Sequence, residues 1–177
     1  MLPFHKKADT LVSAFLFVLW EAAVDDLIKK CKSKAIYLLS RREHGEKELL
    51  KKLIKENSGD CQFVAMAEEV VEELVQRDYV SDTRFAEMTV RSQIARGYGP
   101  NRIRQTLVQK EVPADIMEQV LESLEVDWFA NVVAVRGKKF GLGVVDDMKL
   151  KAKQQRFLQY KGYGFDHIQY AMEANGD

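Results

Sequence analysis

Basic side chains are concentrated in the second half of the chain, where they could bind anions. Residues 84–110 contain six Arg or Lys against one acid, and residues 136–161 contain eight against two. The stretches 68–82 and 111–127 are acidic. Solubility alone is achieved with charges of both signs interspersed, so blocks that carry a single sign of charge call for another explanation. They predict a surface that binds a polyanion, or a protein filament that carries one.

Helical spacing would gather some of these cations on single faces. Lys149, Lys153 and Arg156 stand at i, i+4 and i+7, so they would share one face of a helix. Arg84 and Arg91 are seven residues apart and would do the same. The alternative is that these residues form ordinary solvated helix faces, because a single exposed charge contributes little to stability. The residues expected to contact a partner are Arg84, Arg91, Arg96, Arg102, Arg104, Lys149, Lys153, Arg156 and Lys161.

Signatures of catalysis and of metal binding are missing from the sequence. There is no GxxxxGK[ST] loop for a triphosphate and no nucleophile elbow. The three histidines are scattered, and His44 is interpreted as a turn residue at the start of a helix. The two cysteines stand alone, without CxxC spacing. We therefore expect no catalytic residues, no metal and no cofactor, in a protein that is not an enzyme.

Overall charge and the N-terminal segment limit the kinds of partner. With 27 basic and 27 acidic residues, the net charge of zero disfavours a protein that coats duplex DNA by bulk electrostatics. Residues 11–24 are mostly apolar, but Glu21 ends the uncharged stretch 10–20, which is shorter than the roughly 20 residues of a membrane span. The basic start resembles that of a signal peptide, although Asp9 and the lack of an A-x-A cleavage pattern disfavour secretion. We expect an additional helix here, no membrane partner, and a reducing, cytoplasmic setting.

Local signals along the rest of the chain predict helices separated by short turns. Apolar residues recur at helical spacing, with no sustained alternation of apolar and polar positions. Asp60, and Ser81 or Asp82, are suited to cap helices, and Pro113 is suited to open one. Turns are expected at Gly97, Gly99, Pro100 and Gly162, with a helix starting at Gly99-Pro100 and with Gly97 or Gly99 at positive φ.

The order of these elements predicts an all-α fold of tandem repeats. About nine helices would form three three-helix repeats, at residues 34–80, 81–125 and 126–174, in a curved, elongated array. Residues 1–33 would form a helical N-terminal extension. An offset of 51 residues places Leu107 on Leu158 and aligns KEVPAD with KGYGFD. The alternative is that such weak internal similarity occurs in any all-helical protein, without a true repeat.

Three segments carry a resemblance to a known family. They are SRREHGEKELLKKLIKE at 40–56, VVEELVQRDYVSDTRFAEMTVRSQIARGYGPNRIRQTLVQKEV at 70–112, and KQQRFLQYKGYGFDHIQYAM at 153–172. In order and spacing they resemble RecX, the family of bacterial proteins that regulate the RecA recombinase. The resemblance covers roughly residues 34–174 and implies tandem three-helix repeats without catalytic residues.

Two functions follow as expectations. The resemblance implies a non-enzymatic modulator, in DNA repair, that binds in the groove of the RecA–DNA filament and inhibits RecA's ATPase and strand exchange. The alternative is a regulator that binds single- or double-stranded DNA directly. It would use helix-turn-helix-like units, with Arg102 and Arg104 near a helix N-terminus. In either case we expect a monomer when the protein is free.

Overall fold

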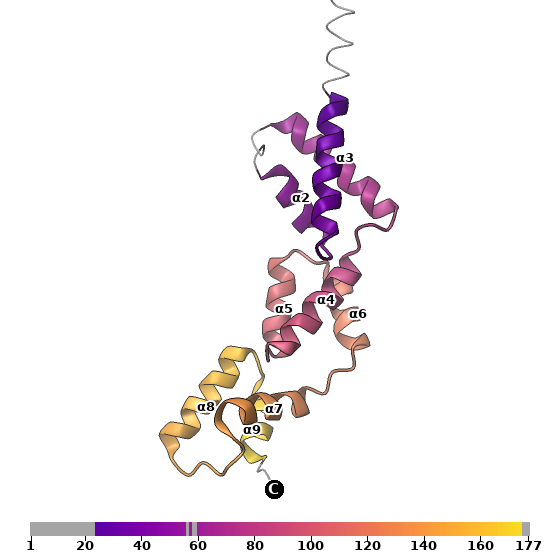
Figure 1. Cartoon of the computed structure of the whole chain (residues 1–177). Helices are drawn as coiled ribbons and strands as arrows, with labels where there is room; N and C mark the ends of the chain where they lie inside the picture. Colours follow the sequence, from indigo (N-terminus) through magenta and orange to yellow (C-terminus); the bar gives the residue numbers. More distant parts are fainter. Residues whose placement is uncertain (1–23, 56, 58–59, 175–177) are drawn as a thin grey trace, which may run out of the picture. The chain divides into compact units, whose positions relative to one another are not determined.

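The computed structural model describes residues 24–55, 57 and 60–174, and the regular structure in these ranges is helical throughout (Figure 1). This confirms the predicted all-α fold. A helical segment at 24–39 is followed by α2 (Glu46–Ile54), α3 (Cys61–Gln76), α4 (Asp82–Ala95), α5 (Pro100–Gln109), α6 (Ala114–Ser123), α7 (Trp128–Phe140), α8 (Met148–Lys161) and α9 (Phe165–Glu173). In the described ranges, none of these helices combines the length and the apolar character that crossing a membrane requires.

The chain divides into two compact units, with the boundary between Val80 and Ser81. In the first unit, the helical segment 24–39 packs with α2 and α3 around a core that includes Cys31, Ala35 and Leu49. Cys31 and Ala35 are one helical turn apart and both are buried in this core. The helix is therefore continuous through residues 33 and 34, where the sequence predicted a boundary between extension and repeat. The rest of the predicted N-terminal helix lies outside the described residues.

His44, just before α2, is a buried turn residue rather than a solvent-exposed one. Its Nδ1 lies 3.0 Å from the carbonyl of Arg42, and its Nε2 lies 2.9 Å from Nζ of Lys52. A neutral ring that donates from Nδ1 and accepts at Nε2 satisfies both contacts. Burial lowers the pKa of His44, which favours this neutral form.

The second unit contains two three-helix groups, α4–α6 and α7–α9, each around its own core. The first core includes Phe85, Ile103 and Leu107, and the second includes Leu158 and Tyr163. Local chemistry explains where the helices begin. The Ser81 hydroxyl accepts a hydrogen bond from the N–H of Arg84 at the start of α4, and the carboxylates of Asp127 and Asp147 do the same for α7 and α8.

Arg136 of α7 is a buried cation that ties the second group together. Its guanidinium donates to the side-chain oxygen of Gln154 (2.9 Å) and to the carbonyl of Gly143 (3.0 Å). It also donates to the carbonyls of Ala171 and Ala174, both at 2.7 Å, at the end of α9. The planar, forked guanidinium suits several acceptors at once. Arg136 belongs to the basic block of residues 136–161 in the sequence, but its buried side chain does not form part of the surface.

Leu107 and Leu158, which the repeat alignment placed at equivalent positions, are both 0% exposed. Leu107→Ala or Leu158→Ala is expected to lower the free energy of unfolding by about 2–5 kcal/mol, because each deletion leaves a cavity in a core. Chemical denaturation of the full chain measures the loss. Val108→Ala, at a 60% exposed neighbour in α5, is the control and should change stability by less than about 0.5 kcal/mol. Losses as small as the control's at both leucines would contradict this assignment.

Candidate partner interface

Two glycine turns meet where the two helical groups of the second unit join. One turn precedes α5, and the other follows α8. Gly97 and Gly162 have φ of 74° and 94°, and Gly99 is the N-cap of α5. The N–H of Gly99 donates to the carbonyl of Lys161 (2.8 Å), and the N–H of Asn101 donates to that of Gly162 (3.1 Å). Carbonyls that α8 leaves unpaired at its end are thus satisfied by donors at the start of α5. We call residues 96–102 with 160–163 the joint.

The joint requires glycine because the two turns approach so closely. A Cβ added to Gly99 would lie 2.7 Å from the carbonyl oxygen of Gly162. A Cβ on Gly162 would lie 2.6 Å from the backbone nitrogen of Arg102, and one on Gly97 would lie 2.9 Å from Cγ2 of Val135. Such separations are shorter than van der Waals contact allows. The sequence predicted these residues as turns, but not that the turns would pair.

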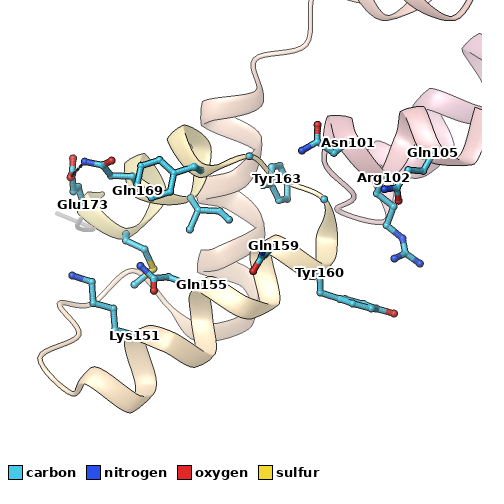
Figure 2. A pocket seen from close by; sticks show the side chains of 15 residues that line it. Asn101, Arg102, Gln105, Lys151, Gln155, Gln159, Tyr160, Tyr163, Gln169 and Glu173 are labelled. Atoms are coloured by element: carbon cyan, nitrogen blue, oxygen red, sulfur yellow. Dashed lines mark hydrogen bonds between the residues drawn. The ribbon is translucent and has the colours of Figure 1, made fainter. Parts of the chain in front are cut away.

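Cations and aromatic rings alternate at the surface of the joint. The Arg102 guanidinium lies 4.9 Å from the ring centroid of Tyr98 and 5.0 Å from that of Tyr160. Figure 2 shows Arg102 on the α5 side and Tyr160 at the end of α8. Nζ of Lys161 lies 4.3 Å from the Tyr98 ring and donates to the carbonyl of Arg96 (3.0 Å). Arg102 and Lys161 therefore make internal cation–π contacts, which also orient the rings.

Tyr163 anchors the inner side of the joint. Its hydroxyl donates to the side-chain oxygen of Asn131 on α7 and lies 3.5 Å from the carbonyl of Gly97. Burial raises the pKa of Tyr163 to about 12.

α8 presents a continuous basic face to solvent. Lys149, Lys153 and Arg156 are exposed, and helical geometry places them opposite the buried Leu158. Tyr160 continues the same stripe, at i+11 from Lys149. No residue of α8 is acidic. We call Lys149, Lys153, Arg156 and Tyr160 the outer face of α8.

Three of the other predicted contact residues, Arg84, Arg91 and Arg104, lie on α4 and α5 rather than on α8. Arg104 forms a bidentate pair with Glu118 of α6, with both N–O distances at 3.1 Å. This hydrogen bonding holds the pKa of Glu118 below its ordinary value. Arg91 lies 3.8 Å from the carboxylate of Glu87, and Arg84 sits in the first turn of α4. Arg104 is therefore not brought into the outer face of α8.

Two grooves flank α8. One of about 870 Å³ lies between the start of α5, α8 and α9, and side-chain amides are its most frequent polar groups (Figure 2). They belong to Asn101, Gln105, Gln155, Gln159 and Gln169. The other, of about 490 Å³, lies beside α4, α7 and α8, and its charged lining residues are the cations Arg96, Lys138, Lys139 and Lys161. Sequence reasoning missed the amide groove, although Gln155 and Gln159 stand at i, i+4.

Within the ranges that the structure describes, no group of three or more His, Cys, Asp or Glu is placed to hold a metal ion. The arrangement offers cations, amides and aromatic rings on an exposed surface. Its chemistry is that of binding, through charge, hydrogen bonding and stacking.

Comparison with known proteins gives a consistent result. Residues 81–121 match the family model of the second three-helix domain of RecX, and residues 125–172 match that of the third. The "Regulatory protein RecX" of Acinetobacter baylyi is 38% identical over 143 residues, which cover 81% of this chain and 86% of that protein. The protein of the same name from Halorhodospira halophila is 41% identical over 140 residues, covering 79% and 84%.

A solved structure is similar in fold. The crystal structure of RecX from Lactobacillus salivarius superposes with a TM-score of 0.67 at 23% sequence identity, covering 84% of this chain and 96% of that chain. At this identity the likeness concerns the fold alone.

The close approach at the joint is tested by Gly162→Ala. The added Cβ meets Arg102 and also forces a non-glycine residue to φ of 94°, so the free energy of unfolding should fall. Gly141→Ala is the control for positive φ, because a Cβ added there would have no atom within 4 Å. With φ of 80° and ψ of 174°, Gly141 lies in a region almost confined to glycine, so the control should lose about 1–3 kcal/mol for its backbone conformation alone. Gly162→Ala should lose more, because the overlap with Arg102 adds about 1–3 kcal/mol to the cost of its own left-handed conformation. Equal losses in denaturation would show that the turns do not pack tightly.

Burial of Tyr163 is tested by spectrophotometric titration of the six tyrosines. Tyr163, whose pKa is about 12, should give a step near pH 12, and Tyr163→Phe should remove that step. Since the unfolded chain ionises this phenol near its ordinary pKa of 10.0, the stability that depends on the protonated form is complete below pH 10. It is lost as the pH rises from 10 towards 12. Absence of a step near pH 12 in the folded protein, or persistence of that step in Tyr163→Phe, would contradict this burial.

Proposed function

The chain belongs to the RecX family of regulatory proteins, and we propose that it regulates the RecA recombinase by binding in the groove of the RecA–DNA filament. It is a regulator rather than an enzyme. Bound there, it lowers the filament's ATPase and strand-exchange activity during DNA repair. It acts in the cytoplasm, as a monomer when free.

The observation that carries this proposal is the outer face of α8. Three exposed cations stand in one line on a helix that has no acidic residue. A filament groove that presents DNA phosphates and acidic side chains is complementary to such a face. Charges of this kind act mainly on the rate of encounter and on the register of docking. The proposal thus assigns the predicted contact residues Lys149, Lys153 and Arg156 to the filament.

Binding alone is sufficient to inhibit. A ligand that binds one conformation of the filament more tightly than the others shifts the filament towards that conformation. If the favoured conformation hydrolyses ATP slowly, turnover falls without any chemical step on the regulator. The basic face lies on a single helix whose end is held at the joint, so it would be presented as one rigid surface, which limits the entropy lost on binding.

A direct DNA-reading regulator is the second candidate, and the contacts of α5 count against it. Its base-reading residues would be Arg102 and Arg104. Arg102 is stacked between two tyrosines, and Arg104 is paired with Glu118. Groove reading would require both side chains to leave these contacts. A steep salt dependence on naked duplex DNA, without any effect on RecA filaments, would favour this candidate.

Reversing the charge of the outer face tests the proposed function. Lys149→Glu with Lys153→Glu is expected to abolish suppression of RecA-catalysed ATP hydrolysis on single-stranded DNA. The melting temperature should be nearly unchanged, because both side chains are exposed. The loss should be larger at low salt, since the screening length shrinks to about 8 Å at physiological ionic strength.

The matched control reverses two exposed lysines of the first unit, Lys29→Glu with Lys55→Glu, which changes the net charge equally. This control should inhibit like the parent protein. If the α8 variant folds and inhibits as strongly as the control, that face is a solvated surface and does not bind the filament.

A further inference from the structure

Tyr160 gives the outer face of α8 an aromatic ring whose position is fixed. The residue is 66% exposed, although it lies in the last turn of a helix that packs on both neighbours. Arg102 lies over one face of the ring, and Arg102 is itself held by Tyr98. Figure 2 shows Tyr160 projecting away from the groove-facing amides of α8. The ring therefore offers an open face to solvent in a preset orientation.

The cations and the ring form one line of defined length. From Lys149 to Tyr160 is eleven residues, or about 16 Å along the helix axis at 1.5 Å per residue. That length matches about five nucleotides at 3.4 Å each, and fewer of an extended strand. Proteins that bind single strands combine cations that track the phosphates with aromatic rings on which bases stack. A duplex keeps its base faces covered, so only an unpaired strand can use the ring.

The amide groove lies beside this line. Gln155 and Gln159 line it from α8 (Figure 2), and helical spacing places them next to the outer face. Side-chain amides both donate and accept, as the edges of unpaired bases do. Among the described residues that line the groove, Glu173 is the one acid, and Gln169 donates to it at 3.1 Å. Bases of a strand on the outer face would thus find hydrogen-bonding partners next to it.

We propose that the outer face of α8 binds single-stranded nucleic acid, with phosphates on Lys149, Lys153 and Arg156 and a base stacked on Tyr160. This rests on the proposed function and makes it more specific, because it assigns this face to the DNA strand rather than to the RecA protein. An acidic protein surface could pair with the three cations, but it does not require the open ring.

Two oligomers of about 12 nucleotides separate the contribution of the ring from that of the cations. One is oligo(dT), and the other is an abasic strand with the same number of phosphates. Binding to the full chain is measured by fluorescence anisotropy without RecA. Tyr160→Ala should weaken binding of oligo(dT) by roughly 5- to 150-fold, the range for loss of one stacked base, and leave the abasic strand unaffected. Tyr160→Phe, which restores the ring, should recover most of the affinity.

Tyr37→Ala is the matched control for the ring. Tyr37 is 60% exposed and has an arginine, Arg41, over its ring at 5.8 Å, but it lies in the first unit. This variant should bind both oligomers like the parent protein. Equal weakening by Tyr37→Ala and Tyr160→Ala would overturn the stacking assignment.

The cations have a different signature. Lys149→Gln with Lys153→Gln should weaken both oligomers alike, and the slope of log K against log salt should become shallower by about 1.4, or 0.7 for each lost phosphate contact. Lys29→Gln with Lys55→Gln removes the same charge elsewhere and should leave the slope unchanged.

The outcomes separate this inference from the proposed function. If the parent protein suppresses the RecA ATPase but does not bind oligo(dT), or if Tyr160→Ala weakens the abasic strand as much as oligo(dT), the strand assignment is wrong. The face would then meet acidic protein, and the proposed function would stand. If the parent protein binds oligo(dT) as described but has no effect on RecA, the proposed function fails and the strand site stands.

Discussion

The pairing of two glycine turns is the constraint on which the candidate interface depends. Gly99 and Gly162 approach so closely that a Cβ on either would overlap backbone atoms of the opposite turn. The hydrogen bonds across this contact join the end of α8 to the start of α5. Arg102 and Tyr160 come from these two helices, so their stacking exists only while the turns are paired. The orientation of the exposed ring therefore follows from the glycine residues that allow the two turns to pair.

Packing also determines which cations remain available to a partner. Arg136 is buried, where it satisfies the acceptors of three chain segments, and Arg104 is paired with Glu118. Lys161 caps the carbonyl of Arg96 and covers a tyrosine ring. A buried charge needs such partners because removing it from water is expensive. What remains in a line on α8 is a small part of the basic residues in the sequence, which explains how a chain of zero net charge can present a strongly basic face.

Features set by neighbouring residues were predictable, and those set by distant contacts were not. The starts of α3 and α4 follow from Asp60 and Ser81, because an N-cap side chain bonds to backbone only two or three residues away. The burial of Arg136 depends on carbonyls that other helices bring to it, so its charge alone indicated a surface residue. The helix through residue 33 likewise continues because Cys31 and Ala35 pack on a core supplied by α2 and α3. For the site, sequence spacing indicated the α8 face, but the joint required two segments more than 60 residues apart in sequence.

Lysine footprinting of the full chain on RecA filaments assembled on single-stranded DNA would decide whether the outer face of α8 binds the filament. Chemical modification followed by mass spectrometry reports the reactivity of each lysine with and without the filament. Lys149 and Lys153 should become protected on the filament, while the exposed Lys29 and Lys55 should keep their reactivity. Protection confined to the first unit, with Lys149 and Lys153 as reactive as in the free protein, would contradict this expectation.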